Sequence, residues 1–339
     1  MSSAPSTVSG KWRSDCNEEV GHIASEDQNG VAQNGVDQNG VDQNGVDQNR
    51  VGQNGVAQRR AMSPLTQSAR SGFGHALAIM LATVLVYANS TGNSFHYDDL
   101  HTIQENPHIR SLANIPQFFT SPESFSREKD YAMFRPLFLV SIAANYAWSG
   151  FDTYSYHLVN ILLHATSSLL LWRILLGFGL APLAALLGGM VFSVHPIGTE
   201  PVNYISSRSE SLAAVFALAA FHLHQLRLVH GRVVYGVCSL ICYGMGLLSK
   251  SVAITLPALL VLLEWTRHRR LTQSMRTMAP YGVIAALYLA IISGFVSKAI
   301  VGEPLRTMGI QAITQTKAVV YYLKLLIFPV GLSVHHQFF

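Results

Sequence analysis

The sequence predicts an all-α polytopic membrane protein. Three observations predict it: 49% of the 339 residues are hydrophobic, only 12% are charged, and long apolar runs follow one another after residue 72. A soluble globular protein carries roughly a quarter charged residues, and a bilayer core selects long apolar runs. The net charge is +4, and the basic residues stand at the ends of apolar runs. There they indicate membrane topology rather than a nucleic-acid surface.

The apolar runs divide the chain into a polar tail and a membrane domain. Residues 1–70 hold no apolar run, and residues 28–57 repeat a five-residue unit whose commonest form is QNGVD. One Val in each unit cannot bury enough apolar surface to offset chain entropy, so we expect a disordered cytoplasmic tail rather than a short solenoid. Residues 71–339 are then a multi-pass membrane domain. It begins with an uncleaved anchor at residues 73–88, because no signal-peptide pattern precedes that run.

The arginines predict which side of the membrane each loop faces. Arg59, Arg60 and Arg70 precede the first run, which places the N-terminus in the cytoplasm and the loop from about 89 to 155 outside. Later basic clusters fall on the cytoplasmic side only if the run 134–148 does not cross. We therefore expect that run to be an interfacial helix on the outer surface. The chain then has seven or eight spans, the later ones drawn from runs 157–176, 183–194, 212–228, 233–248, 252–265, 281–301 and 318–330.

The strongest candidate for chemistry is the pair Asp98 and Asp99, in the first external loop beside His96, Tyr97 and His101. Adjacent side chains point different ways in any regular structure. One carboxylate can therefore face a reacting hydroxyl as a general base. The other can bind a cation, a backbone amide or a neighbouring base. The alternative is a solvated loop or a helix N-cap.

Two further external loops, 195–210 and 249–251, are rich in ionisable groups. The first holds His195, Glu200, Arg208 and Glu210, a density that favours function, although Arg208 and Glu210 also suit a local ion pair with a helix cap. Lys250 stands at a helix break, where it can bind a phosphate as a point charge. Alternatively, it is a lysine that reaches from a helix end to the membrane surface.

Residues 311–328 are amphipathic. Thr314, Lys317, Tyr321 and Lys324 are three or four positions apart and share one face of a helix. This segment is a last span or a second interfacial helix, and a basic, aromatic face at the outer interface suits a lipid phosphate. A helix end anchored by Lys and Tyr is the alternative.

Short motifs occur in a fixed order across residues 73–339, and no single one is specific. They are F-x-Y-D-D at 95–99, E-N-P-H-I-R at 105–110, F-R-P-L at 134–137, Y-H-L-V-N-I-L-L-H at 156–164, H-P-x-x-T-E-P-V at 195–202, S-R-S-E at 207–210, L-L-S-K at 247–250 and T-Q-T-K…Y-Y-L-K-L-L-I-F-P at 314–329. In this ordered set the chain resembles the transmembrane and tetratricopeptide-repeat O-mannosyltransferases, whose membrane domain is of the glycosyltransferase-C type. The resemblance looks closer to bacterial-type members than to animal ones.

The resemblance implies a polyprenyl- or dolichyl-phosphate donor of mannose or another hexose, and an acceptor hydroxyl on protein Ser/Thr or on a glycan. It also implies a catalytic acid in the first external loop. Our hypothesis makes Asp98 the general base, while Asp99 orients the acceptor or binds a divalent cation, if one is used. Lys250, Lys317 and Arg208 would offset the charge of the lipid phosphate. The remaining pocket residues would be His96, Tyr97, Arg135, His195, Glu200 and Glu210.

The chain departs from the family in three ways. Ser251 follows Lys250 where the family often has Glu, the pentapeptide tail is not a family feature, and the sequence stops before further helices and the repeats. We therefore expect a membrane domain truncated at its C-terminus, in a bacterial inner membrane rather than the endoplasmic reticulum. The alternatives are a non-catalytic transporter or lipid-binding scaffold, or an inactive truncated relative. Charges that gather at external ends of runs favour headgroup chemistry over transport.

Overall fold

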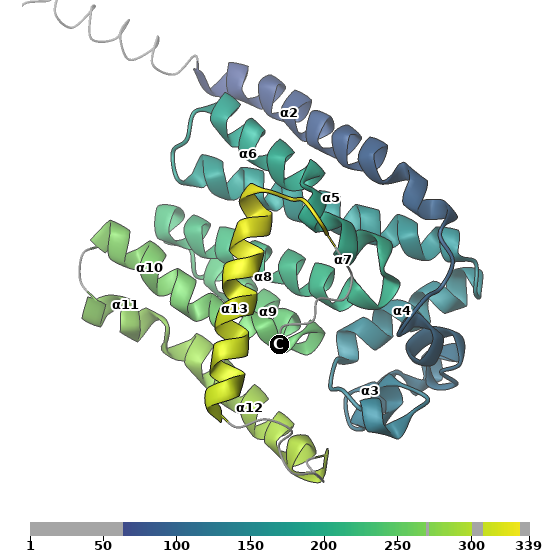
Figure 1. Ribbon diagram of the computed structural model, residues 1–339. Coiled ribbons are helices and arrows are strands. Elements are labelled where there is room, and N and C mark those ends of the chain that lie inside the picture. Colours follow the sequence, from purple (N-terminus) through teal and green to yellow (C-terminus); the bar gives the residue numbers. More distant parts are fainter. Residues whose placement is uncertain (1–63, 269–270, 300–307, 333–339) are drawn as a thin grey trace, which may run out of the picture. The chain divides into compact units, whose positions relative to one another are not determined.

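The computed structural model describes residues 64–268, 271–299 and 308–332, and in these residues it contains helices and no strand (Figure 1). The repeats predicted for residues 28–57 lie outside the described residues. The α-helices are α2 (Pro64–Tyr87), α3 (Ile115–Phe118), α4 (Pro136–Ser149), α5 (Thr153–Gly177), α6 (Pro182–Val194), α7 (Thr199–Asn203), α8 (Arg208–His230), α9 (Val233–Ser249), α10 (Leu256–His268), α11 (Leu271–Thr277), α12 (Ala279–Ala299) and α13 (Met308–Ile327). Helix α2 thus includes residues 64–70, which were predicted to belong to the tail.

Several helices can cross a bilayer. In the described part of the chain, three are long and apolar enough to do so: Gly72–Gly92, Thr153–Gly177 and Ile205–His230. A fourth span forms if Pro182–Val194 and Pro196–Asn203, which meet at a bend of 49°, cross together. Three shorter apolar helices are Val233–Ser249, Ser251–Trp265 and Ala279–Phe295. The predicted all-α polytopic membrane class is confirmed, whereas the predicted seven or eight spans are reached only if the shorter helices also cross.

Helix α8 is the centre of the packing. It packs along both α5 and α9, and α5 also packs against α6. Helix α2 covers this group from one side and presents large apolar side chains outward, with Phe73 74% and Leu85 76% exposed. Such an outward apolar surface is unfavourable in water and suits contact with lipid.

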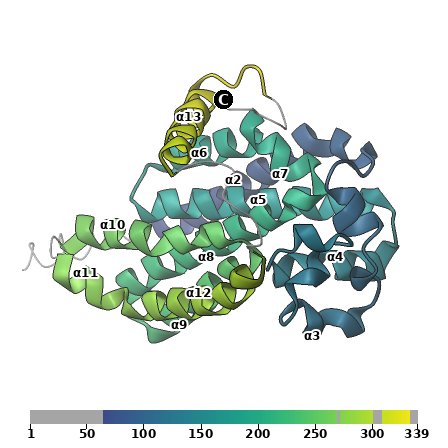
Figure 2. The same cartoon turned by 60° about the horizontal axis from the view of Figure 1, so that its bottom comes forward.

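Helix α4 occupies the run predicted to be interfacial. Its 14 residues extend about 21 Å, less than the roughly 30 Å of a hydrocarbon core. Phe138 and Ile142 of α4 pack against Ile103 and Ile109 of the preceding loop, and all four are fully buried. The loop between α2 and α4 therefore has its own apolar core, and α3 and α4 lie together at the end of the helices away from α10 and α11 (Figure 2). The position of α4 at the outer membrane surface stays a prediction.

The segment 195–210 is more ordered than the predicted loop. It forms a 3-10 turn at Pro196–Gly198, helix α7, a second 3-10 turn at Ile205–Ser207, and the first turn of α8, which begins at Arg208. Glu210 lies in this first turn, where a negative charge is favourable beside free backbone N–H groups. The prediction of one polar loop over residues 195–210 was therefore wrong in its local structure: short helical turns occupy residues 196–207, and α8 begins four residues before the apolar run that suggested it. Its place outside the membrane stays a prediction.

Candidate active site

The chain enters the site through a left-handed residue. Tyr97 has φ +51°, a conformation that costs a non-glycine residue about 1–2 kcal/mol. The Tyr97 ring makes edge contacts with His96 and Tyr204, at centroid distances of 5.5 and 6.2 Å. A single π-helical turn, Leu100–Gln104, follows directly. This sharp change of direction sets the two aspartates between the end of α2 and the start of α8.

Asp99 is part of the scaffold. Its side chain is fully buried; Oδ1 accepts hydrogen bonds from the amide and hydroxyl of Ser206, at 2.7 and 2.6 Å, and Oδ2 accepts one from the His96 amide at 3.3 Å. Burial raises the pKa of Asp99, and the hydrogen bonds from Ser206 and His96 oppose that shift. The expected roles of Asp99, orienting the acceptor or binding a cation, do not fit this geometry, because both oxygens are already used inside the protein.

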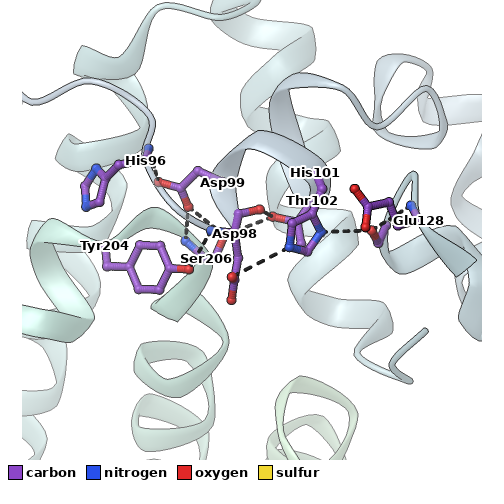
Figure 3. A network of polar contacts seen from close by, with 9 residues as sticks. His96, Asp98, Asp99, His101, Thr102, Glu128, Tyr204 and Ser206 are labelled. Carbon is purple, nitrogen blue, oxygen red and sulfur yellow. Dashed lines mark hydrogen bonds and ion pairs between the residues drawn. The ribbon is translucent and has the colours of Figure 1, made fainter. Parts of the chain in front are cut away.

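Asp98 is held by its backbone while its carboxylate is open. The Asp98 amide donates to the Tyr204 hydroxyl at 2.9 Å, and the Asp98 carbonyl accepts from the Thr102 hydroxyl at 2.6 Å. Its side chain is 65% exposed, with Oδ1 3.6 Å from Nε2 of His101. Figure 3 shows the two carboxylates pointing in different directions, as expected for neighbouring residues. Of the pair, Asp98 is therefore the one that can meet a substrate.

A pocket of about 520 Å³ is lined by His96 and Tyr204, whose backbone amide and hydroxyl contact the two aspartates, but not by Asp98 or Asp99 themselves. Its polar wall includes His96, Tyr204 and Glu200, and α13 closes it with Tyr322 and Leu325. The His96 ring stacks on Tyr204 at 5.5 Å and 27°. Burial raises the pKa of Tyr204, so its hydroxyl stays protonated and can accept from Asp98 while keeping its own hydrogen to donate. The structure thus joins His96 and Glu200 at one pocket.

A second, more apolar pocket of about 510 Å³ lies between α5, α6 and α8. His195 and Glu210 line it together with apolar side chains such as Leu171, Val191 and Phe192. The His195 Nε2 lies 3.2 Å from the Leu326 carbonyl of α13. The structure therefore divides four of the predicted pocket residues between two cavities, whereas Tyr97 lines neither of them and Arg135 lines a separate pocket beside Phe134 and Tyr288.

Two cations gather at the start of α8. Lys250 forms an ion pair with Glu210, and the Arg135 guanidinium donates to the Ser209 hydroxyl at 3.1 Å. Burial lowers the pKa of Arg135, and the nearby charges of Glu210 and Asp98 are among the influences that oppose the shift. The charge of Arg135 thus acts on the exposed aspartate, and that of Lys250 on Glu210.

The other two predicted phosphate ligands lie elsewhere. Arg208 is fully buried and donates to the Asn160 side chain at 2.7 Å and to the Tyr156 carbonyl at 2.9 Å. It joins α8 to α5, and this burial leaves no surface for a lipid phosphate, so the predicted role does not fit. Lys317 is on the exposed face of α13. Like Lys250 and Arg135, it lines neither of the two pockets.

Sequence reasoning missed the residues that hold the aspartates. Tyr204 hydrogen-bonds the Asp98 amide from 106 positions away in the chain, and Ser206 hydrogen-bonds the Asp99 carboxylate from 107 positions away. No local pattern marks such contacts, because they depend on how α8 packs against the loop. Among the described residues, no group of three or more His, Cys, Asp or Glu side chains is arranged to hold a metal ion.

No family model and no solved structure matches this sequence. Curated proteins do match it. A Caenorhabditis elegans protein O-mannosyl-transferase is 29% identical over 170 residues, 48% of this chain and 24% of the relative. The Mus musculus protein O-mannosyl-transferase TMTC3 is 30% identical over 152 residues, 44% of this chain and 16% of the relative. The Homo sapiens protein O-mannosyl-transferase TMTC1 is 32% identical over 182 residues, which are 50% of this chain and 20% of the relative.

The chain is related to these transferases. The similarity covers about half of the chain, and the chain spans a quarter or less of the length of each of these relatives. All three are animal proteins, so they give no support to the predicted bacterial type. The glycosyltransferase-C assignment is likewise left as a prediction.

Proposed function

We propose that residues 71–339 form the catalytic membrane domain of a glycosyltransferase. It transfers mannose or another hexose from a polyprenyl- or dolichyl-phosphate donor to a hydroxyl of a protein Ser/Thr or of a glycan. The names of the relatives support the reaction class. The observation that carries the proposal is the contrast within the aspartate pair: Asp99 fully buried, Asp98 65% exposed with its backbone held from both sides.

In the proposed reaction, the Asp98 carboxylate takes the proton of the acceptor hydroxyl. The acceptor oxygen forms its bond to the anomeric carbon as the bond from that carbon to the phosphate oxygen breaks, and the electron pair leaves with the phosphate. The anomeric configuration inverts. Lys250 and Arg135 offset the growing charge on the phosphate, and Lys250 exchanges its contact with Glu210 for that contact.

The two pockets suit different parts of the substrates. The 510 Å³ pocket has apolar walls within the helices, which suits the first isoprene units of a lipid donor. The 520 Å³ pocket has polar and aromatic walls, which suits a sugar or an acceptor peptide. In this arrangement the fold is glycosyltransferase-C-like, with the loop and α4 on the non-cytoplasmic side. We keep the bacterial inner membrane only as the compartment that the sequence motifs suggested.

The test is sugar transfer by membranes that contain the protein, using dolichyl-phosphate [3H]mannose and polyprenyl-phosphate donors with a Ser/Thr-rich peptide. We expect Asp98→Asn to lower transfer about 10²–10⁴-fold, the usual contribution of a general base. The matched control is Asp152→Asn, the same change in an exposed carboxylate of the turn between α4 and α5. Asp152 caps α5 through its side chain, and Asn caps a helix equally well. Transfer by Asp98→Asn at the rate of the control would refute the proposal.

A further inference from the structure

One histidine faces the exposed carboxylate. His101 Nε2 lies 3.6 Å from Asp98 Oδ1, and the His101 side chain is only 17% exposed. The two residues are one helical turn apart, and Figure 3 shows the imidazole between Asp98 and the segment that carries Glu128. The function proposed above does not yet use this ring.

The imidazole is held on its other side. Its Nδ1 lies 2.9 Å from the Ser126 hydroxyl, which also accepts a hydrogen bond from the Glu128 amide at 3.0 Å. The ring stacks on Tyr131 at 4.8 Å and 26°. Ser126 is buried, so its hydroxyl hydrogen is directed to the acceptor within reach, Nδ1.

This arrangement selects one tautomer. An ionised carboxylate only accepts hydrogen bonds, so the nitrogen that faces Asp98 has to donate. In the tautomer with the hydrogen on Nε2, the Ser126 hydroxyl donates to Nδ1 and Nε2–H faces Asp98 Oδ1 at 3.6 Å, beyond hydrogen-bond distance. The carboxylate is otherwise exposed and free to rotate, and a fixed N–H donor is what would hold it in one orientation.

The other charges near His101 are few and mostly solvated. Arg127 donates its amide to the His101 carbonyl at 3.0 Å, and its side chain pairs with Glu105 at the surface, where both are about half exposed or more. Glu128 is exposed. Arg135 acts on Asp98 rather than on the imidazole. The electrostatic field of an exposed ion pair is strongly screened by solvent. Asp98 is therefore the charge that acts most strongly on the His101 ring.

We propose that His101 is the positioning residue for Asp98. As the exposed Asp98 side chain turns to meet the acceptor, His101 Nε2–H hydrogen-bonds one carboxylate oxygen, and the other oxygen then faces the acceptor hydroxyl. This inference rests on the proposed function, because it assigns the orientation of the same base.

Two substitutions separate the effect of the His101 N–H donor on transfer from the effect of its aromatic ring. His101→Phe keeps an aromatic face for Tyr131 and removes the N–H, whereas His101→Gln keeps an N–H donor. With the mannose-transfer assay, we expect His101→Phe to lower kcat about 10–100-fold, with KM for the acceptor changed less than twofold. His101→Gln should keep most of kcat. A merely structural role of the ring would lower kcat in both variants alike, with no rescue by the N–H donor of Gln.

The controls are His108→Gln, in the same loop, and Asp98→Asn. His108→Gln should keep the wild-type rate. If Asp98→Asn is inactive while both His101 variants keep the wild-type rate, the positioning role is refuted and the proposed function stands. If Asp98→Asn is fully active, the proposed function itself fails. Should His101→Phe not accumulate in membranes, His101→Leu is compared with His101→Gln, and equal kcat values in these two variants refute the inference.

Discussion

The two ends of α8 carry polar clusters of opposite kind. Near its C-terminal end, His224 is 0% and Glu264 1% exposed; they lie 2.9 Å apart, and the Tyr281 hydroxyl is 3.1 Å from the other ring nitrogen of His224. Ser239 binds Tyr281, and Thr277 binds Glu264. Every polar group of this cluster named here has a partner, and the cluster joins α8 to α9, α10, α11 and α12.

At the N-terminal end of α8, by contrast, Asp98 is 65% exposed and Lys250 and Glu210 are partly exposed. Charged groups that are fully paired and buried stabilise one arrangement, and they have no hydrogen-bonding capacity left for a ligand. Groups whose backbone is held while the charged atoms stay exposed can react. The comparison teaches that density of ionisable residues does not by itself distinguish the two, whereas exposure and pairing do.

The largest expected effect is on stability at the buried cluster. Glu264→Ala leaves His224 and Thr277 without their acceptor in an interior site, which should lower the free energy of unfolding by about 3–5 kcal/mol. Asp98→Ala, at an exposed site, should change it by less than about 0.5 kcal/mol. Thermal unfolding in detergent measures both. Equal shifts for the two variants would contradict the division into a closed and an open cluster.

A smaller effect is expected at Lys250. Lys250→Ala removes a point charge proposed to meet the donor phosphate, so we expect KM for the lipid donor to rise about tenfold, or 1.4 kcal/mol. The difference from wild type should shrink as salt is added, because the contact is partly exposed and screened. Lys324→Ala, on the exposed surface of α13, is the control. A donor KM that is the same in both variants would remove Lys250 from the phosphate site.

The smallest effect concerns Asp99 and pH. Its pKa is raised by burial, so the folded protein binds this proton more tightly than the unfolded chain does. The stability due to Asp99 is therefore fully present below the ordinary carboxyl pKa, about 3.9, and is lost as pH rises through the raised value. Wild type should gain stability relative to Asp99→Asn on acidification from pH 7. A stability difference that is constant with pH, measured by thermal unfolding, would show that the hydrogen bonds from Ser206 fully offset burial.

Much of the fold could be predicted because it depends on local composition. The run 157–176 became α5, which starts four residues earlier and ends one later, and the run 233–248 became α9, which starts at the same residue and ends one later. The start of α8 could not be predicted, because Arg208 looks like a loop residue until its guanidinium reaches Asn160 and Tyr156 of α5. A buried arginine is tolerated only when distant partners satisfy it, and distant partners are not visible in a local pattern.

The sequence by itself determined that this is a helical membrane protein and that two neighbouring carboxylates follow its first span. It also implied that the two point apart, since neighbouring side chains diverge in any regular backbone. Only the tertiary structure decided which one is buried. Ser206, more than a hundred positions away, supplies the two shortest hydrogen bonds to Asp99, and the 3-10 turn that carries Ser206 packs on the loop through Ile205, in one apolar cluster with Ile103 and Ile109. Composition determines secondary structure over a few neighbouring residues, whereas the burial of a side chain depends on how the whole chain packs.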